Sequence, residues 1–263
     1  MKKTVLLFII LFISSITHAK NVVQMSMPKA GTHLLKKCIC SLTNIHSVIH
    51  ATNANPIDFY IAIPEKFKHI SQNEKHWVTH LFFNKKFEPY LNNDQNAFFF
   101  IYRDPRDQII SFAYFMLPRS NNWPRASKIS LDELIMELIT NGKIYNNHPP
   151  CKNINDLYQQ YTPWLYNLNV CPLKFEDLVG PKGGGNLETQ LHSVKKIADH
   201  LGIFLTEKQI QQKANTLFGG THTFRKGQIG TWKKHFKEHH KAAFKEVAGQ
   251  LLIDLGYEES FDW

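Results

Sequence analysis

The stretch AFFFIYRDPRD, residues 97–107, does most to decide the fold of this chain. Its first six residues, Ala97–Tyr102, are continuously apolar, which is typical of a parallel strand that is buried on both faces. Arg103 follows directly, at the point where such a strand would end. We expect a helix from about Pro105 to Met116. The stretch therefore predicts a buried strand, a loop that carries a cation, and a helix.

Segments of the same kinds alternate along the rest of the chain. Further strands are expected at Val22–Met27, His76–Phe83 and Val170–Phe175. Helical patterns lie near residues 33–42, 131–140 (opened by a capping box at Ser130), 155–168 (with a break or restart at Pro163), 187–201, 206–217 and 239–255. This alternation predicts an α/β fold, a central parallel sheet flanked by helices. Residues 182–186, KGGGN, read as a flexible surface linker, and nothing in the 263 residues marks a second domain.

The segment VVQMSMPKAGTH, residues 22–33, places a turn with a glycine between the first strand and its helix. This order is the usual housing of a phosphate, because the amides at a helix N-terminus point toward the anion. Gly31 lets the backbone approach a phosphate closely, Thr32 offers a hydroxyl, and Lys29 supplies charge. The spacing of a Walker A loop is missing, which counts against an ATP-hydrolysing P-loop protein. The alternative is an ordinary strand-to-helix turn.

Two more segments carry groups suited to phosphate. Arg103 offers a planar fork of donors, and Ser111, eight residues later, adds a hydroxyl from the following helix. The segment FRKGQIGTWK, residues 224–233, again combines cations with glycines. By itself, Arg225–Gly227 reads equally well as a surface loop. Together, the three segments predict a divided anion site that closes only when distant parts of the chain fold together.

In this order, the three segments resemble the phosphosulfate-binding and 3′-phosphate-binding motifs of sulfotransferases that use 3′-phosphoadenosine 5′-phosphosulfate (PAPS) as donor. The resemblance runs from about Val22 to the C-terminal helix. One matching segment would be unspecific, whereas three in family order are specific. The resemblance implies a three-layer, P-loop-like sulfotransferase domain over residues 20–263. It also implies sulfuryl transfer to an acceptor hydroxyl or amine, with PAPS as co-substrate and no metal.

The resemblance assigns donor contacts to individual positions. The 5′-phosphosulfate would be held by Lys29 and the amides of Ala30, Gly31, Thr32 and His33. The 3′-phosphate would be held by Arg103 and Ser111, and its pocket completed by Arg225, Lys226 and Gly227. Phe175 stands where many relatives have a tyrosine that contacts the donor, so here it would pack or stack.

His80 is the proposed general base. It lies in the segment Val78–Leu81, VTHL, which resembles the Lys-Thr-His-Leu segment of small-molecule sulfotransferases. A histidine can take the acceptor's proton as sulfur is attacked, while Lys29 stabilises charge on the departing phosphate. The lysine of that family segment is Val78 here, so electrostatic support is expected to be weaker or to come from Lys29 alone.

Several departures from the family pattern leave alternatives open. The usual residues are replaced at Ala30, His33, Leu34 and Thr231. A degenerate protein that binds adenosine bisphosphate without transferring anything is one alternative, and a P-loop kinase is another. The presence of the proposed base and of the phosphate ligands favours the enzyme. Acceptor specificity is expected from residues 44–75, 118–130 and 141–153, which carry no readable code.

The first 19 residues have the form of a secretory signal peptide, with two lysines, a short apolar run and small residues before Ala19. Cleavage would place the protein on a secretory route, exported or lumenal and without a stable membrane span. An uncleaved membrane anchor and a cytoplasmic location are the alternatives. The net charge of +9 suits an anionic donor, and no zinc-finger or arginine-rich pattern points to nucleic acid. The oligomeric state has no sequence signature.

Other polar positions are expected to be structural. Arg106 and Asp107 read as an exposed local pair, and Glu176 and Asp177 as a cap on the join between strand and helix. The four cysteines show no metal spacing. Free buried thiols are expected, with a Cys151–Cys171 disulfide as the alternative in an exported protein.

Overall fold

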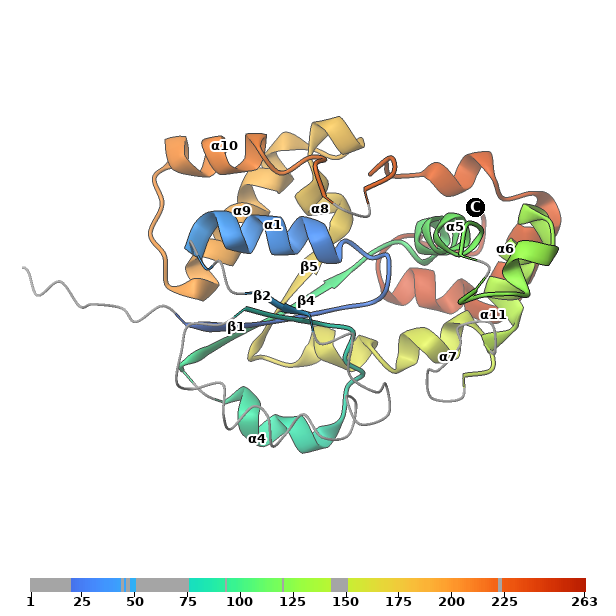
Figure 1. Cartoon of the computed structure of the whole chain (residues 1–263), viewed down its shortest axis with the longest axis horizontal. Coiled ribbons are helices and arrows are strands. Elements are labelled where there is room, and N and C mark those ends of the chain that lie inside the picture. The colour runs from blue at the N-terminus through green and yellow to red at the C-terminus, as the bar shows by residue number, and fades with distance from the viewer. Residues whose placement is uncertain are drawn as a thin grey trace, which may run out of the picture.

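A computed structural model describes residues 20–43, 45, 48–50, 76–92, 94–119, 121–142, 151–221 and 224–263. The expected signal peptide and most of the expected acceptor segment 44–75 lie outside the described residues. Figure 1 shows a sheet with helices on both of its faces. The five strands are all parallel and lie in the order β2-β3-β1-β4-β5. They comprise β1 (Asn21–Ser26), β2 (Val48–His50), β3 (His76–Thr79), β4 (Asn96–Tyr102) and β5 (Val170–Lys174). The α/β class and the central parallel sheet are confirmed.

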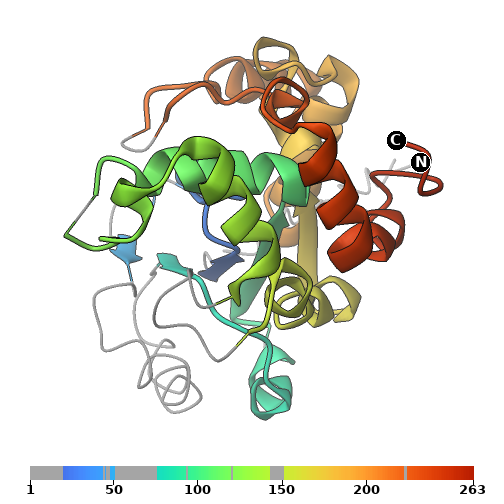
Figure 2. The ribbon, with the colours of Figure 1, turned by 90° about the vertical axis from the view of Figure 1, so that its right-hand side faces the viewer.

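The helices fall into groups that cover different sides of the sheet (Figure 1). One group contains α1 (Thr32–Thr43), α8 (Phe175–Val179), α9 (Leu187–Leu201) and α10 (Glu207–Asn215). The remaining helices are α4 (Glu88–Leu91), α5 (Pro105–Met116), α6 (Leu131–Thr140), α7 (Ile154–Gln159) and α11 (Glu238–Asp254). Figure 2 looks onto α5, α6 and α11, which lie together at one end of the molecule. The carboxyl ends of the strands therefore lie between the α1 group and the group of α5, α6 and α11.

Strand β4 shows why the sheet has two cores. Because side chains alternate along a strand, Phe98 and Phe100 face one side, and Phe99 and Ile101 face the other. The first pair packs in the core beneath α5, α6, α7 and α11, and the second pair in the core beneath α1, α8, α9 and α10. All four side chains are buried. The continuous apolar run is thus the consequence of two covered faces, as the sequence predicted.

Three local expectations need correction. Strand β3 stops at Thr79 instead of reaching Phe83, because the backbone of Phe83 turns away and donates its N–H to the carbonyl of Gln160 at 2.8 Å. The predicted helix 155–168 divides into α7 and a 3₁₀ segment, Thr162–Tyr166, so the restart expected at Pro163 is present but the second part is not α-helical. The short elements β2, α4 and α8 were not predicted.

The glycine segment 182–186 is not a flexible linker. Gly183 is buried, and its carbonyl accepts the N–H of Ile229 at 2.9 Å. Asn186 is the N-cap of α9, its side chain accepting from the amides of Glu188 and Thr189. A Cβ at Gly183 would lie 2.7 Å from the carbonyl oxygen of Gly227. The glycine therefore permits the close approach of residues 224–233, which we call the C-terminal segment.

Candidate active site

The segments singled out in the sequence meet at the carboxyl edge of the sheet. Four neighbouring strands end there, and each is followed by one predicted site residue or segment. Strand β1 leads to the loop of Lys29, β3 to His80, β4 to Arg103 and β5 to Phe175. The edge of an open parallel sheet is where such folds bind ligands. Parallel pairing therefore brings together positions that are up to about 150 residues apart in the chain.

The loop between β1 and α1 has an unusual backbone. Lys29 has a φ of 67°, the one positive value among the non-glycine residues that the structure describes, and Gly31 has a φ of 107°. A Cβ at Gly31 would lie 2.9 Å from Cδ2 of Phe175 and 3.0 Å from Cδ1 of Ile101. Only glycine fits here. The first-turn amides of α1 have no partners within the helix and open toward this loop, whereas the amide of Ala30 donates to the carbonyl of Met27 at 3.2 Å.

Four cations gather beside this loop. Burial, together with the charges of Arg119, Arg103 and Arg225, lowers the pKa of Lys29 to about 8. The Lys29 ammonium lies 4.2 Å from the centre of the Phe115 ring, and the guanidinium of Arg119 lies 3.8 Å from the same ring. Arg119 was not singled out from the sequence, since it lies in a segment that the sequence linked only to the acceptor. Like charges held this close favour an anionic ligand.

His80 stands beside β1 and is fixed by it. Its Nδ1 lies 2.8 Å from the carbonyl oxygen of Ser26 and 3.2 Å from the Ser26 hydroxyl. Because a carbonyl oxygen only accepts, Nδ1 carries the hydrogen in the neutral ring, and the basic lone pair lies on Nε2. The backbone carbonyl of His80 accepts from the Tyr161 hydroxyl at 3.3 Å. The contacts of Nδ1 with Ser26 orient the ring, and the bond from Tyr161 holds the backbone of His80.

Arg103 is buried, and three different groups hold it. Its guanidinium lies 4.3 Å from the centre of the Phe175 ring, donates to the carbonyl of Gln228 at 2.8 Å, and lies 3.4 Å from the carboxylate of Asp107. Its Nε has no hydrogen-bond partner among the described residues. A buried donor of this kind is costly unless a ligand completes it. Phe175 thus stacks under a guanidinium, in keeping with an aromatic position that lacks a hydroxyl.

Asp107 does not form the exposed pair with Arg106 that the sequence suggested, because both side chains are buried. Arg106 pairs with Asp104 at 2.8 Å and with Glu258, and it lies 4.0 Å from the centre of the Trp232 ring. The Asp107 carboxylate accepts the N–H groups of Gly230 and Trp232, both at 2.8 Å. Asp107 therefore fastens the C-terminal segment to α5, beside Arg103.

The remaining predicted donor ligands lie at the rim. Ser111 is half-buried on α5, two turns beyond Arg103, and Arg225 and Lys226 are exposed. The Arg225 guanidinium lies 4.1 Å from the centre of the Tyr114 ring, which places it over the same helix. Gly227 has a φ of 60° and accommodates the Phe224 ring, which a Cβ would meet at 2.6 Å. Burial, together with the nearby charge of Arg103, lowers the pKa of Arg225, so these two cations lie close to each other. Among the described residues, no hydrogen bond, ion pair or ring contact joins Ser111 or Lys226 to Arg103.

Glu176 also differs from expectation. Its carboxylate reaches across to the loop after β4, where it accepts the N–H of Asp104 at 3.0 Å and the hydroxyl of Tyr257 at 2.9 Å. At the join between β5 and α8, the N-cap residue Lys174 makes no side-chain capping hydrogen bond. Burial raises the pKa of Glu176 to about 7. Glu176 therefore ties Tyr257, which follows α11, to the loop that carries Arg103.

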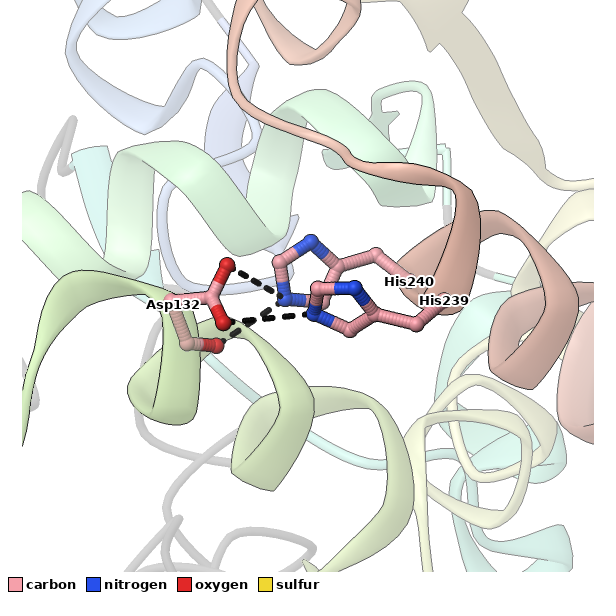
Figure 3. A group of neighbouring side chains, drawn as sticks. All are labelled: Asp132, His239 and His240. Carbon is pink, nitrogen blue, oxygen red and sulfur yellow. Dashed lines mark hydrogen bonds and ion pairs between the residues drawn. The ribbon is translucent and has the colours of Figure 1, made fainter.

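A separate cluster could suggest a metal site. Asp132 on α6 lies next to His239 and His240 at the start of α11 (Figure 3). However, Nδ1 of His240 accepts the N–H of Lys237 at 3.1 Å, so Nε2 carries the hydrogen and lies 3.0 Å from the carbonyl oxygen of Asp132. The Lys237 ammonium also lies 2.7 Å from the Asp132 carboxylate. A protonated nitrogen is not a metal ligand, and these contacts form a junction between α6 and α11.

The comparisons with known proteins agree with this geometry. Residues 19–256 match the family model described as "Sulfotransferase domain". The chain belongs to the sulfotransferase family. The family's curated members include Sulfotransferase 6B1 of Danio rerio, 24% identical over 190 residues, and Sulfotransferase 6B1 of Mus musculus, 28% identical over 202 residues. The matches cover 59% and 69% of this chain, and 55% and 60% of the relatives, so they span little more than half the length of these sulfotransferases.

Solved structures show the same fold. The crystal structure of mouse sulfotransferase SULT7A1 complexed with PAP superposes with a TM-score of 0.63 at 16% identity. The superposition covers 90% of this chain and 87% of that one. The P-loop-like architecture inferred from the sequence is thereby confirmed. Within the part of the chain that the structure describes, no helix combines the length and the apolar character needed to cross a membrane.

The state of the cysteines agrees with the first expectation from the sequence. Cys38, Cys40, Cys151 and Cys171 are all free, so the alternative Cys151–Cys171 disulfide is not formed. Burial raises the pKa of the Cys38 thiol to about 12 and that of the Cys171 thiol to about 11. These two thiols are therefore protonated and unreactive at neutral pH.

Proposed function

We propose that the protein transfers the sulfuryl group of PAPS to an acceptor hydroxyl or amine, within one catalytic domain over residues 20–263. The observation that carries this proposal is a cluster of cations around the N-terminus of α1, with His80 directly after the adjacent strand β3. The cations are Lys29, Arg103, Arg119 and Arg225. A bisphosphate with a sulfuryl group carries negative charge that would balance the positive charge of this cluster. A PAP-bound structural neighbour and family membership support the same donor.

The 5′ end of the donor is assigned to the loop between β1 and α1. There the first-turn amides of α1 and the Thr32 hydroxyl would hold phosphate and sulfate oxygens. Lys29 reaches the same region from its left-handed backbone position, over the Phe115 ring. A cation at this place would stabilise the negative charge that builds on the phosphate oxygen as it leaves. Arg119, which contacts the same ring as Lys29, would add its positive charge at this place.

The 3′-phosphate is assigned to Arg103, Ser111 and Arg225. Arg103 has a buried Nε with no partner among the described residues and is held rigidly by Phe175. Arg225 closes the pocket from the C-terminal segment, which Asp107 fastens beside it. A preorganised guanidinium loses little freedom when it binds a phosphate, which favours affinity.

The chemical step follows from the tautomer of His80. Its Nε2 takes the proton of the acceptor hydroxyl or amine while the acceptor atom attacks sulfur. A new bond forms between sulfur and the acceptor, and the bond between sulfur and the phosphate oxygen breaks on the opposite side. The products are the sulfated acceptor and 3′-phosphoadenosine 5′-phosphate (PAP). The protein contributes the base, the field of its cations and the alignment of the reactants.

Binding of PAP, compared with adenosine 5′-phosphate, tests this function without knowledge of the acceptor. Calorimetry should show a strong preference for PAP, because only PAP engages Arg103 and Arg225. Arg103→Ala should weaken PAP binding by about 1.5–3 kcal/mol, as expected for a charge-assisted contact. Arg125→Ala is the matched control, because Arg125 is exposed and pairs with Glu137 on α6. Equal affinity for the two nucleotides would refute the divided phosphate site.

A positive result leads to the transfer assay. Labelled PAPS is incubated with panels of phenols, alcohols and amines, and transfer of label is followed. Preference for PAP together with transfer to any acceptor supports the enzyme. PAP binding with no transfer across all classes supports the degenerate binder that the departures at Ala30, Leu34, Val78 and Thr231 suggest.

A further inference from the structure

A chain of buried hydroxyls joins His80 to the phosphate loop. Ser26 is the last residue of β1, and its side chain is fully buried. Its hydroxyl lies 3.2 Å from Nδ1 of His80 on one side and 2.7 Å from the hydroxyl of Thr32 on the other. Thr32 is the first residue of α1 and is itself 9% exposed. The three side chains come from β1, from the loop after β3 and from α1.

The backbone carbonyl of Ser26 fixes the direction of hydrogen bonding at the His80 end of this chain of hydroxyls. Nδ1 of His80 donates to the carbonyl oxygen of Ser26 at 2.8 Å, so it has no lone pair for the Ser26 hydroxyl. The Ser26 oxygen therefore accepts a second, weaker share of the Nδ1 hydrogen. Either hydroxyl of the Ser26–Thr32 pair can donate, and donation from Ser26 to the oxygen of Thr32 is the direction that continues the donation from His80. Thr32 in turn is left to donate its hydrogen to a further acceptor at the mouth of the phosphate loop.

We propose that Ser26 and Thr32 form a hydrogen-bond relay that couples the general base to the 5′-phosphosulfate site. Ser26 is a positioning residue, and the acceptor of the last hydrogen is an oxygen of the donor's phosphate or sulfate. This inference rests on the proposed function, since it assigns a partner to both His80 and the donor. No proton travels along the relay. It transmits polarisation only, because every hydrogen stays on the atom that holds it.

The relay acts when charge moves during the reaction. As Nε2 of His80 takes the acceptor's proton, the ring becomes cationic and Nδ1 becomes a stronger donor. Stronger donation to the Ser26 oxygen makes the Ser26 hydroxyl a stronger hydrogen-bond donor to Thr32. The Thr32 hydroxyl then donates a stronger hydrogen bond to the phosphate or sulfate oxygen of PAPS. The phosphate oxygen gains negative charge in the same step. The relay therefore strengthens an interaction in the transition state more than in the ground state.

A second contact allows the effect of the relay to be distinguished from a purely structural effect of Ser26. The side chain of Gln24 donates to the backbone carbonyl of Thr32 at 2.6 Å, and its oxygen lies 3.0 Å from Nε2 of His76. Gln24 and Ser26 lie on the same face of β1, two residues apart. Gln24 thus places the backbone of Thr32 independently of the Ser26 hydroxyl. Removal of that hydroxyl should leave both the loop and the carbonyl contact of His80 in place.

The kinetic test uses Ser26→Ala with a conservative partner. Ser26→Ala should lower kcat about tenfold, the effect of a lost hydrogen bond of about 1.4 kcal/mol, while Kd for PAP stays within about twofold. Ser26→Thr, which keeps the hydroxyl, should recover most of kcat. In the double variant with Thr32→Val, the loss in kcat should be smaller than the product of the single losses. An unchanged kcat in Ser26→Ala, or a parallel loss of kcat and PAP affinity, would overturn the relay.

A spectroscopic test needs no donor and covers the case in which the variants fold poorly. Nitrogen-15 spectra of the unaltered protein, with His80 assigned by loss of its signals in His80→Ala, should show hydrogen on Nδ1. Hydrogen on Nε2 would reverse the direction of the chain and overturn the relay even if PAP binds. Failure of the unaltered protein to bind PAP would instead refute the proposed function, whichever tautomer is observed.

Discussion

At the scale of single residues, Lys29 gives a prediction in pH. Burial and three nearby arginines lower its pKa to about 8, so Lys29 is charged below that pH and neutral above it. The arginines keep their charge over the whole range. PAP affinity should therefore fall as pH rises through about 8, by roughly tenfold if a charge-assisted contact of about 1.4 kcal/mol is lost. Calorimetry at pH 7 and pH 9.5 measures this.

Lys29→Met is the control for that pH dependence. This variant should bind PAP more weakly at pH 7 and should show little further loss at pH 9.5, because the titrating group is absent. If Lys29→Met retained the same fall in affinity with pH, another group would be responsible, and Lys29 would not face the donor.

His80 gives the second prediction at this scale. His80→Ala should lower kcat by roughly 10²–10⁴-fold, the range for loss of a general base. Kd for PAP should change little, because the base is assigned to the acceptor and not to the nucleotide. Steady-state kinetics and calorimetry on the same samples separate the two. His239→Ala is a matched control, since His239 is exposed at the α6–α11 junction. Full turnover in His80→Ala would remove His80 from the mechanism.

At the scale of elements, α5 and the C-terminal segment are joined by Asp107. In Asp107→Asn, the amide nitrogen would face the N–H group of Gly230 or Trp232, and Arg103 would lose its buried counter-charge. We expect the free energy of unfolding to fall by about 1–3 kcal/mol. PAP affinity should fall as well, because the segment that carries Arg225 would loosen. Urea denaturation and calorimetry measure the two effects.

The control for Asp107 is another aspartate in an ion pair. Asp199 pairs with Lys195 at 2.6 Å on the exposed surface of α9. Exposed pairs contribute about 0–1 kcal/mol, so Asp199→Asn should leave stability and binding nearly unchanged. Asp107→Asn with unaltered PAP affinity would show that the C-terminal segment closes the site without this anchor.

At the scale of the whole molecule, the site is a junction of segments from both groups of helices. PAP should bridge α1, α5 and the C-terminal segment, and thereby stabilise the folded chain. At a PAP concentration of 100 times Kd the expected gain is about 2.7 kcal/mol, which corresponds to a rise in Tm of roughly 5–10 °C. Thermal unfolding followed by calorimetry measures it. Adenosine 5′-phosphate at the same concentration should give a clearly smaller rise, and an equal rise would argue against the junction.

The sequence by itself determined the class of fold and the family. A run such as Ala97–Tyr102 is apolar at every position only when both faces of a strand are covered, and that local pattern predicts a parallel sheet. Glycine at position 31 is set by backbone conformation, and this requirement is also local. The order of the three phosphate-type segments identified the family, which the match over residues 19–256 confirmed. The roles assigned to individual residues remain predictions.

Only the tertiary structure decided what holds the site together. Asp107 looked like half of an exposed pair because its partners, the amides of Gly230 and Trp232, lie more than 120 positions along the chain. Arg119 and Ser26 were overlooked, and Gly183 was misread as part of a flexible linker, for the same reason. Their importance arises from neighbours that local sequence does not reveal. A strand or a helix is specified by its own residues, but a contact between distant segments depends on how the elements pack, and here that packing assembles the site.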